Sequence, residues 1–205
     1  MNAAACTSSC NPSISNGVTV SNIAIDASGH VTANVVASCS ASNASFTLRV
    51  TDTGGLFAQA TLNVNVTASN AAVITLKPAA IVQANDQHSY QTFTITQMVQ
   101  SVTDDCNGDV INNIVIEKAT SDEVENGPNT GNTLNDIVIA SGCQSVKVRA
   151  ERDGSKDGRV YLVTLRVSDS SGNITRAVYK VSVPRGNNPV VDSGVHYTVN
   201  SSCQL

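Results

Sequence analysis

One strand–turn–strand sequence occurs twice in this chain, and this repeat constrains the fold more than any other feature. Residues 48–55 read LRVTDTGG, and residues 165–172 read LRVSDSSG. The similarity continues beyond the turn at the same offset of 117 positions, so that Val66 corresponds to Val183. A hairpin sequence that recurs at a fixed offset predicts two β modules of one kind in tandem.

Alternation of apolar and polar residues dominates the chain, and sustained helical periodicity is missing, so the expected fold class is all-β. We expect a short immunoglobulin-like module at residues 1–70, a β-sandwich at residues 71–184, and a C-terminal tail at residues 185–205 that offers one further strand. The inward positions expected in the first module are Val31, Ala33, Val35, Ala37, Phe46, Leu48, Val50, Ala60, Leu62, Val64 and Val66.

Two local irregularities lead to further predictions. The alternation changes phase at Ser21-Asn22, and such a change predicts a β-bulge. In the tail, residues 195–199 alternate like a strand that has no obvious place in the second module.

Composition excludes several classes of partner. The chain has 205 residues, a formal charge of −4 and only 14% charged residues. Lys and Arg do not cluster, which argues against a nucleic-acid partner. No run of about 18 apolar residues occurs, so no membrane span is expected in this chain. Mild acidity leaves two readings open, simple solubility or a calcium-dependent surface.

Several segments of the second module resemble known modules. They read VTDDC at 102–106, VRAERDG at 148–154, DGRVY at 157–161 and VSDSSGN at 167–173. In these segments the chain resembles bacterial extracellular immunoglobulin-like modules of the hyalin-repeat and polycystic-kidney-disease type. The resemblance implies a β-sandwich and a secreted or cell-surface protein, and such modules serve adhesion, spacing and assembly alike. Tyr161 opens the penultimate strand, either as a tyrosine corner or as a core residue.

The six cysteines predict three disulfides and therefore an oxidising compartment. Their spacing does not fit a zinc site. Six cysteines allow about fifteen pairings, and the economical choice joins Cys106 to Cys143 and Cys10 to Cys39. Cys6 and Cys203 then remain, and they bond either to each other or to neighbouring subunits.

Acidic residues gather at three turns where loops could meet, and calcium is coordinated by several such oxygen ligands. No group fits the calcium-loop pattern, so the alternative is a solvated surface on which Asp and Asn cap turns. The calcium candidates are Asp104, Asp105, Asp109, Asp122, Glu123, Glu125, Glu151, Asp153 and Asp157.

Catalysis is not expected, because the three histidines are scattered and no catalytic motif occurs. The leading hypothesis is a subunit of an extracellular fibre or stalk, in which open sheet edges pair with a strand from another subunit to form a homopolymer. The strand-exchange candidates are Val195, Tyr197 and Val199, or the segment before Cys10. The alternative is an adhesion or spacer module of a larger secreted protein, stiffened by calcium.

Overall fold

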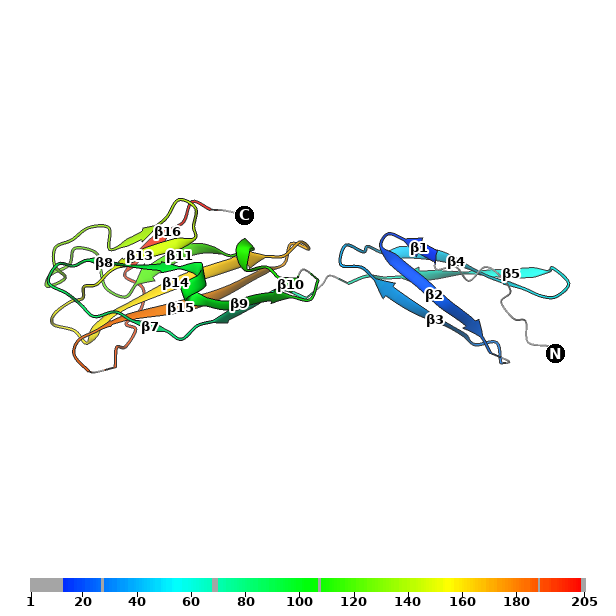
Figure 1. The fold of residues 1–205 in the computed structure, drawn as a ribbon, viewed down its shortest axis with the longest axis horizontal. Helices are drawn as coiled ribbons and strands as arrows, with labels where there is room; N and C mark the ends of the chain where they lie inside the picture. Colours follow the sequence, from blue (N-terminus) through cyan, green and yellow to red (C-terminus); the bar gives the residue numbers. More distant parts are fainter. Residues whose placement is uncertain (1–12, 27, 68–69, 107, 188, 204–205) are drawn as a thin grey trace. The chain divides into compact units, whose positions relative to one another are not determined.

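The computed structural model describes residues 13–26, 28–67, 70–106, 108–187 and 189–203. The prediction of an all-β sandwich protein is confirmed. The chain divides into two compact units, unit 1 (residues 1–69) and unit 2 (residues 70–205), so the tail belongs to unit 2 (Figure 1).

Unit 1 consists of two small antiparallel sheets. The first has the strand order β1-β2-β3, with β1 at Ser13–Ser15, β2 at Val18–Ile25 and β3 at Val31–Ala37. The second is the hairpin of β4 (Ala44–Thr51) and β5 (Phe57–Val64).

The predicted bulge in unit 1 is confirmed. The register between β2 and β3 shifts between Ser21 and Ala24, and Asn22 takes a φ of 49°. Asparagine tolerates this left-handed backbone better than most residues, which explains its place at the bulge.

Unit 2 is a larger sandwich. One sheet has the order β16-β11-β14-β15-β7, with bounds Tyr197–Asn200, Val115–Ser121, Gly158–Ser168, Ile174–Pro184 and Ala80–Ile81. A second has the order β12-β13-β8, at Ile137–Ile139, Ser145–Arg149 and Tyr90–Thr94. A third has the order β10-β9-β6, at Gly108–Asp109, Val99–Asp104 and Val73–Leu76.

Two short helical turns interrupt the strands of unit 2. Helix α1 spans Ile95–Met98, and the 3₁₀ turn η1 spans Ile111–Asn113. The sequence pattern predicts a strand over 111–118, but the strand begins only at Val115. The apolar residue Ile114 is fully buried at the end of the turn, so the alternating pattern reflects burial here and not a strand.

The core of unit 2 lies between its sheets. Met98, Ile116, Leu165 and Val181 are among its fully buried side chains. Tyr161 is also fully buried, and its hydroxyl donates to the carbonyl of Arg149, 3.0 Å away and twelve residues upstream. The core alternative for Tyr161 is therefore confirmed, whereas its backbone bond reaches further upstream than the few residues that define a tyrosine corner.

The long polar loop before β12 owes its shape to asparagine. Asn126, Asn129, Asn132 and Asn135 all have φ between 52° and 66°. Asparagine forms local turns and adopts this left-handed region with little strain, so its enrichment between residues 121 and 135 reflects repeated tight turns.

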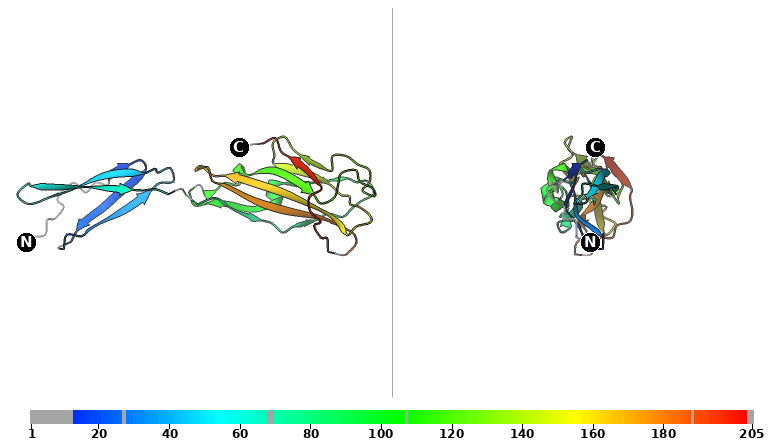
Figure 2. Two further views of the ribbon diagram at one scale, coloured as in Figure 1. Left: turned by 180° about the vertical axis from the view of Figure 1, so that it is seen from behind. Right: turned by 90° about the vertical axis from the view of Figure 1, so that its right-hand side faces the viewer.

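The tail has a place in unit 2, contrary to the prediction. Strand β16 pairs antiparallel with β11, from Ser121 opposite Tyr197 to Lys118 opposite Asn200. Seen from behind in Figure 2, β16 (red) lies beside β11 at the edge of the sheet. Within one copy this strand is therefore not free for donation, because β11 already pairs with it from Lys118 to Ser121. Val195 lies just before the strand and is 60% exposed.

Candidate functional site

The inner face of unit 1 is only partly covered. Val18, Val20, Ala44 and Phe46 form a small buried core where the two sheets meet. Toward the opposite ends of the strands the β2–β3 pair diverges from the β4–β5 hairpin (Figure 1). We call the exposed inward residues of unit 1 the open face: Val31 and Val50 at this end, and Val35 and Ala60 closer to the core.

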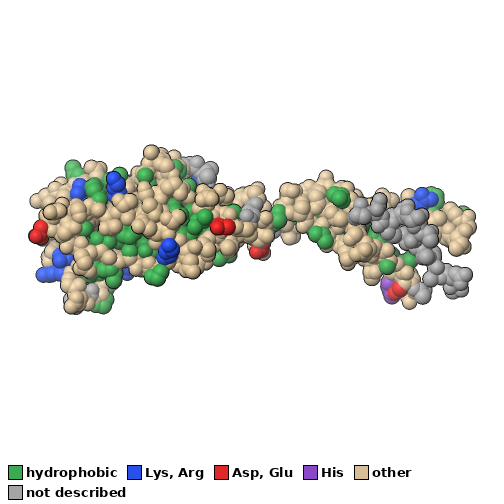
Figure 3. All heavy atoms as spheres, viewed as in Figure 1, with side chains coloured by type: hydrophobic (Ala, Val, Ile, Leu, Met, Phe, Trp, Pro, Cys, Tyr) green, Lys and Arg blue, Asp and Glu red, His purple; other side chains and the backbone are tan. Residues whose placement is uncertain are grey.

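The open face consists of positions that the alternation predicts to be core. Val31 is 52% exposed and Val35 is 45% exposed. Their prediction as inward-facing residues agrees with the register, because Val35 lies opposite the buried Val20. Their prediction as buried residues is wrong, because β3 is an edge strand of its sheet and the described strands of unit 1 leave these side chains partly uncovered. The face of unit 1 seen in Figure 3 carries few charged side chains, with hydrophobic ones between polar neighbours.

The internal repeat shows what unit 1 lacks. The hairpin β4–β5 corresponds to β14–β15, which is flanked in unit 2 by β11 on one side and β7 on the other. Among the described strands, β4 pairs only with β5. The two units therefore differ in burial at a repeated position. Val167 is 0% exposed in unit 2, while its counterpart Val50 in unit 1 is 42% exposed.

In unit 2 the most unusual group of residues surrounds Arg159, which is fully buried. Its Nε donates to Glu123 at 2.9 Å, and its Nη1 donates to Asp136 at 2.7 Å. Nη1 also lies 3.5 Å from Glu151 and 3.0 Å from the Tyr161 hydroxyl. We call Arg159 with Glu123, Asp136 and Glu151 the Arg159 cluster.

The Arg159 cluster contains three carboxyl groups and one guanidinium. Thr133 donates to Glu151, and Arg149 lies 3.7 Å from Asp136 at the rim. Burial raises the pKa of Glu151 above its usual range, against the lowering effect of the Thr133 hydrogen bond. Burial likewise raises the pKa of Glu123, although Arg159 opposes this. Burial lowers the pKa of Arg159, but Tyr161 and the carboxylates outweigh it, so the guanidinium stays charged.

The structure brings together two of the three acidic groups that were predicted as calcium ligands. Glu123 and Glu151 belong to the Arg159 cluster, and Glu125 accepts the Asp136 amide. Asp122 accepts the amide of Val160, and burial raises its pKa. The Asp153 amide donates to Glu123, and the Asp157 carboxylate accepts the amide of Val191.

The third acidic group lies elsewhere, in the β9–β10 turn. Asp104 and Asp109 cap this turn by accepting the amides of Cys106 and Ile111. Asp105 accepts from the side chain of Asn70. Across the described ranges no three His, Cys, Asp or Glu side chains are arranged to hold a metal ion. Calcium binding stays a prediction.

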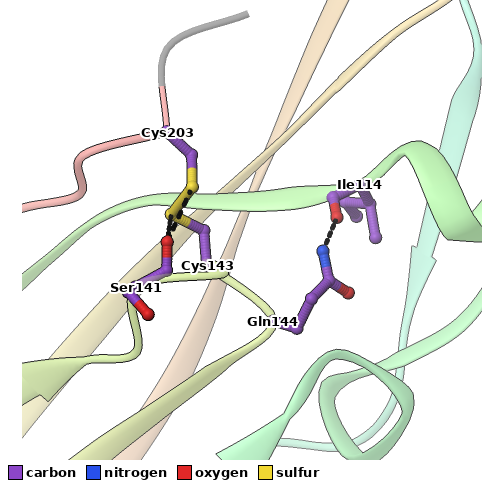
Figure 4. The surroundings of a disulfide bond; sticks show 5 residues. All are labelled: Ile114, Ser141, Cys143, Gln144 and Cys203. Carbon is purple, nitrogen blue, oxygen red and sulfur yellow. Dashed lines mark hydrogen bonds between the residues drawn. A yellow bond between two sulfur atoms is a disulfide. The ribbon is translucent and has the colours of Figure 1, made fainter.

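The disulfide pairing differs from the expected one. Cys143 bonds to Cys203, with Cα atoms 6.2 Å apart (Figure 4). The predicted Cys106–Cys143 and Cys6–Cys203 bonds are therefore wrong. The reason is the tail: β16 runs along β11, and β11 also contacts the Cys143 turn, whose carbonyl accepts the Ile116 amide at 2.9 Å. Cys39 is also disulfide-bonded, but Cys6 and Cys10 lie outside the described residues, so the Cys10–Cys39 pair stays a prediction.

Two residues of the Arg159 cluster were not among the sequence candidates. Arg159 occupies an inward position, in phase with Tyr161 and Val163, so an arginine in the apolar phase was the available signal. The alternation predicts a strand over residues 160–168, which leaves Arg159 outside it, whereas β14 begins at Gly158. Asp136 gave no comparable signal, because it lies at the end of an irregular loop.

Comparisons with known proteins give little for this chain. No protein-family model matches it, and no characterised protein matches it in sequence. One solved structure with a likeness is a Ca²⁺-stabilized adhesin that helps an Antarctic bacterium reach out and bind ice. The identity is 19%, the TM-score is 0.24, and the match covers 82% of this chain but 37% of the adhesin. Among the described residues, no helix is long and apolar enough to cross a membrane.

Proposed function

We propose that this chain is a non-enzymatic extracellular structural protein, a subunit of a cell-surface fibre or stalk that assembles by β-strand addition. The observation that carries the proposal is the open face of unit 1, where Val50 is 42% exposed although its repeat counterpart Val167 is 0% exposed. Disulfides at Cys39, Cys106 and Cys143 support an oxidising, extracellular location.

A strand from a second copy would complete unit 1. In unit 2, β11 pairs antiparallel with β14, placing Ala119 opposite Val163 and Ile116 opposite Leu165. The repeat counterparts of Val163 and Leu165 on β4 are Phe46 and Leu48. The added strand therefore pairs with β4 in the same register and covers the open face with alternate apolar residues.

Assembly of this kind has a defined geometry. The contact joins unit 1 of one copy to a different part of the next, so it is heterologous and extends into a filament unless the rotation closes a ring. Because β16 is held within unit 2, the donor is another segment. The segment before Cys10 is the remaining candidate from the sequence, and it lies outside the described residues.

Adjacent residues on β3 provide a matched test. Val35 belongs to the open face, whereas its neighbour Val36 points to the other side and is 62% exposed. Light scattering after size exclusion, with negative-stain microscopy, measures assembly of the native chain. Val35→Glu is expected to lower the mean mass and remove fibres, and Val36→Glu is expected to leave both unchanged. A wild-type monomer at high concentration, or equal behaviour of the two variants, contradicts the proposal.

The second candidate is an adhesion or spacer module stiffened by calcium. The observation that favours it is Glu123 Oε1, which is buried beside other carboxyl groups and has no hydrogen-bond partner in the described part of the chain. A cation that binds only the folded state raises the melting temperature. A shift below about 1 °C between saturating calcium and chelator rejects a structural calcium site.

A further inference from the structure

A hollow of about 570 Å³ lies on the outer side of the five-stranded sheet of unit 2. The residues that line it include Lys118 from β11, Thr164 and Arg166 from β14, and Arg176 from β15. Thr164 and Arg166 are 9% and 8% exposed and form its floor, whereas Lys118 and Arg176 are exposed at its rim. The tail segment beyond β16 closes one side with Ser201.

The floor of the hollow contains an arginine, Arg166, that forms no ion pair among the described residues, although, after the Arg176 hydrogen bond, its charge helps to lower the pKa of Glu117. Arg166 and Arg176 lie directly opposite each other on β14 and β15, an arrangement in which like charges repel. The charge of Arg176 is balanced by Glu117. Nε and Nη2 of Arg176 donate to the two carboxylate oxygens of Glu117 at 2.8 and 2.9 Å. In Arg166 the same two groups, Nε and Nη2, are buried, and neither has an acceptor among the described residues.

The repeat allows the environment of Arg166 to be compared with that of the corresponding arginine in unit 1. The counterpart of Arg166 in unit 1 is Arg49, whose guanidinium lies 4.0 Å from the centre of the Phe57 ring. Opposite Arg49 stands the neutral Gln59, not a second arginine. Unit 1 therefore gives its arginine an aromatic partner and no like charge, whereas among the described residues of unit 2 no aromatic ring lies over Arg166 and its Nε and Nη2 have no acceptor.

A buried donor without an acceptor is costly, and a buried guanidinium more so. We propose that the hollow binds a carboxylate group, which accepts hydrogen bonds from Nε and Nη2 of Arg166. Because neither nitrogen is exposed in the free chain, a flexible side chain at the rim moves aside to admit the ligand. Arginine binds carboxylates through two parallel N–H groups, as the Arg176–Glu117 pair does beside it. With Lys118 and Arg176 at the rim, the charged residues of the hollow are three cations and one anion, which favours an acidic ligand.

The test is NMR of the arginine Nε–H groups in the full chain. Sodium acetate is added at constant ionic strength against sodium chloride, and the Arg166 signal is expected to shift saturably, with a Kd on the order of millimolar for so small a ligand. D-galacturonate and N-acetyl-aspartate amide then distinguish a sugar acid from an acidic side chain, and D-galactose is the neutral control.

Two variants separate the site from general charge effects. Arg166→Lys keeps the charge but loses the paired N–H groups, and it is expected to weaken acetate binding at least tenfold. Arg49→Lys, the repeat counterpart, is expected to bind acetate as the wild type does. Since a lysine variant could unfold, the melting temperature is measured as well, and acetate is expected to raise that of the wild type more than that of Arg166→Lys.

Three results overturn the proposal. One is an Arg166 signal that acetate does not move in the folded chain. Another is an equal shift with chloride or sulfate, which means general anion screening. The third is a loss of acetate binding in Arg49→Lys that matches the loss in Arg166→Lys. The site is independent of fibre assembly, because Val35→Glu, which tests assembly, lies in unit 1.

Discussion

Replacing Arg159 with methionine tests whether its guanidinium stabilises the buried carboxylates of the Arg159 cluster. The guanidinium is 0% exposed and lies within 3.5 Å of the Glu123, Asp136 and Glu151 carboxylates. Removing one partner of a buried ion pair typically costs about 3–5 kcal/mol, because the remaining charges lose their counter-ion but stay away from water. For a domain of this size the expected fall in the melting temperature of unit 2 is roughly 10–20 °C.

The assay is thermal and urea unfolding of the full chain, followed by a probe that reports on unit 2. The matched control is Arg176→Met, because Arg176 pairs with Glu117 at 2.8 Å but is 51% exposed. Surface pairs contribute about 0–1 kcal/mol, so this variant should unfold close to the wild type.

Acid conditions provide a second check on the same variant. Without Arg159 the buried carboxylates favour their neutral form, so the deficit of Arg159→Met is expected to shrink as the pH falls from 7 to 5. The reasoning is refuted if Arg159→Met unfolds within about 1 kcal/mol of Arg176→Met at pH 7. It is also refuted if the deficit grows on acidification.

Three further predictions follow from single features. Replacing both Cys143 and Cys203 with serine opens a loop with a sequence separation of 60 and should destabilise unit 2 by about 4 kcal/mol, measured by urea unfolding; no change contradicts the bond. Burial raises the pKa of Glu151, so the folded state resists its ionisation and the wild type should lose stability relative to Glu151→Gln as the pH rises from 4.5 to 7; the opposite slope in melting temperature refutes this. Phe46→Ala removes the largest of the four buried side chains in the core of unit 1 and should destabilise unit 1 by about 3 kcal/mol in urea unfolding; a loss below about 1 kcal/mol shows that other contacts hold unit 1.

Much of the local structure was predictable, because side chains of a strand alternate with a period of two and turns have their own residue preferences. The bulge near Asn22 and the inward phase of Val35 followed from this alternation alone. The β14–β15 hairpin was also predictable, because its strand–turn–strand sequence occurs a second time in the β4–β5 hairpin.

Contacts between distant segments were not predictable in the same way. The Cys143–Cys203 bond depends on where the tail lies, and the tail is placed by ladder bonds to β11 that any strand of suitable length could make. The grouping of Glu123, Asp136 and Glu151 depends on three loops that Arg159 joins from the end of β14. Neither arrangement has a signal in the local sequence, because the partners are far apart along the chain.

Val50 and Val167 separate what sequence determined from what tertiary structure decided. They occupy the same position of the repeat and the same side of their strands, and the alternating pattern assigns both to an inner face. Val167 is fully buried and Val50 is 42% exposed. Alternation fixes the side of the sheet to which a residue points, because successive Cβ atoms project to opposite faces. Whether another layer covers that side depends on strands from elsewhere, and only the tertiary structure shows that unit 2 has them and that the described part of unit 1 does not.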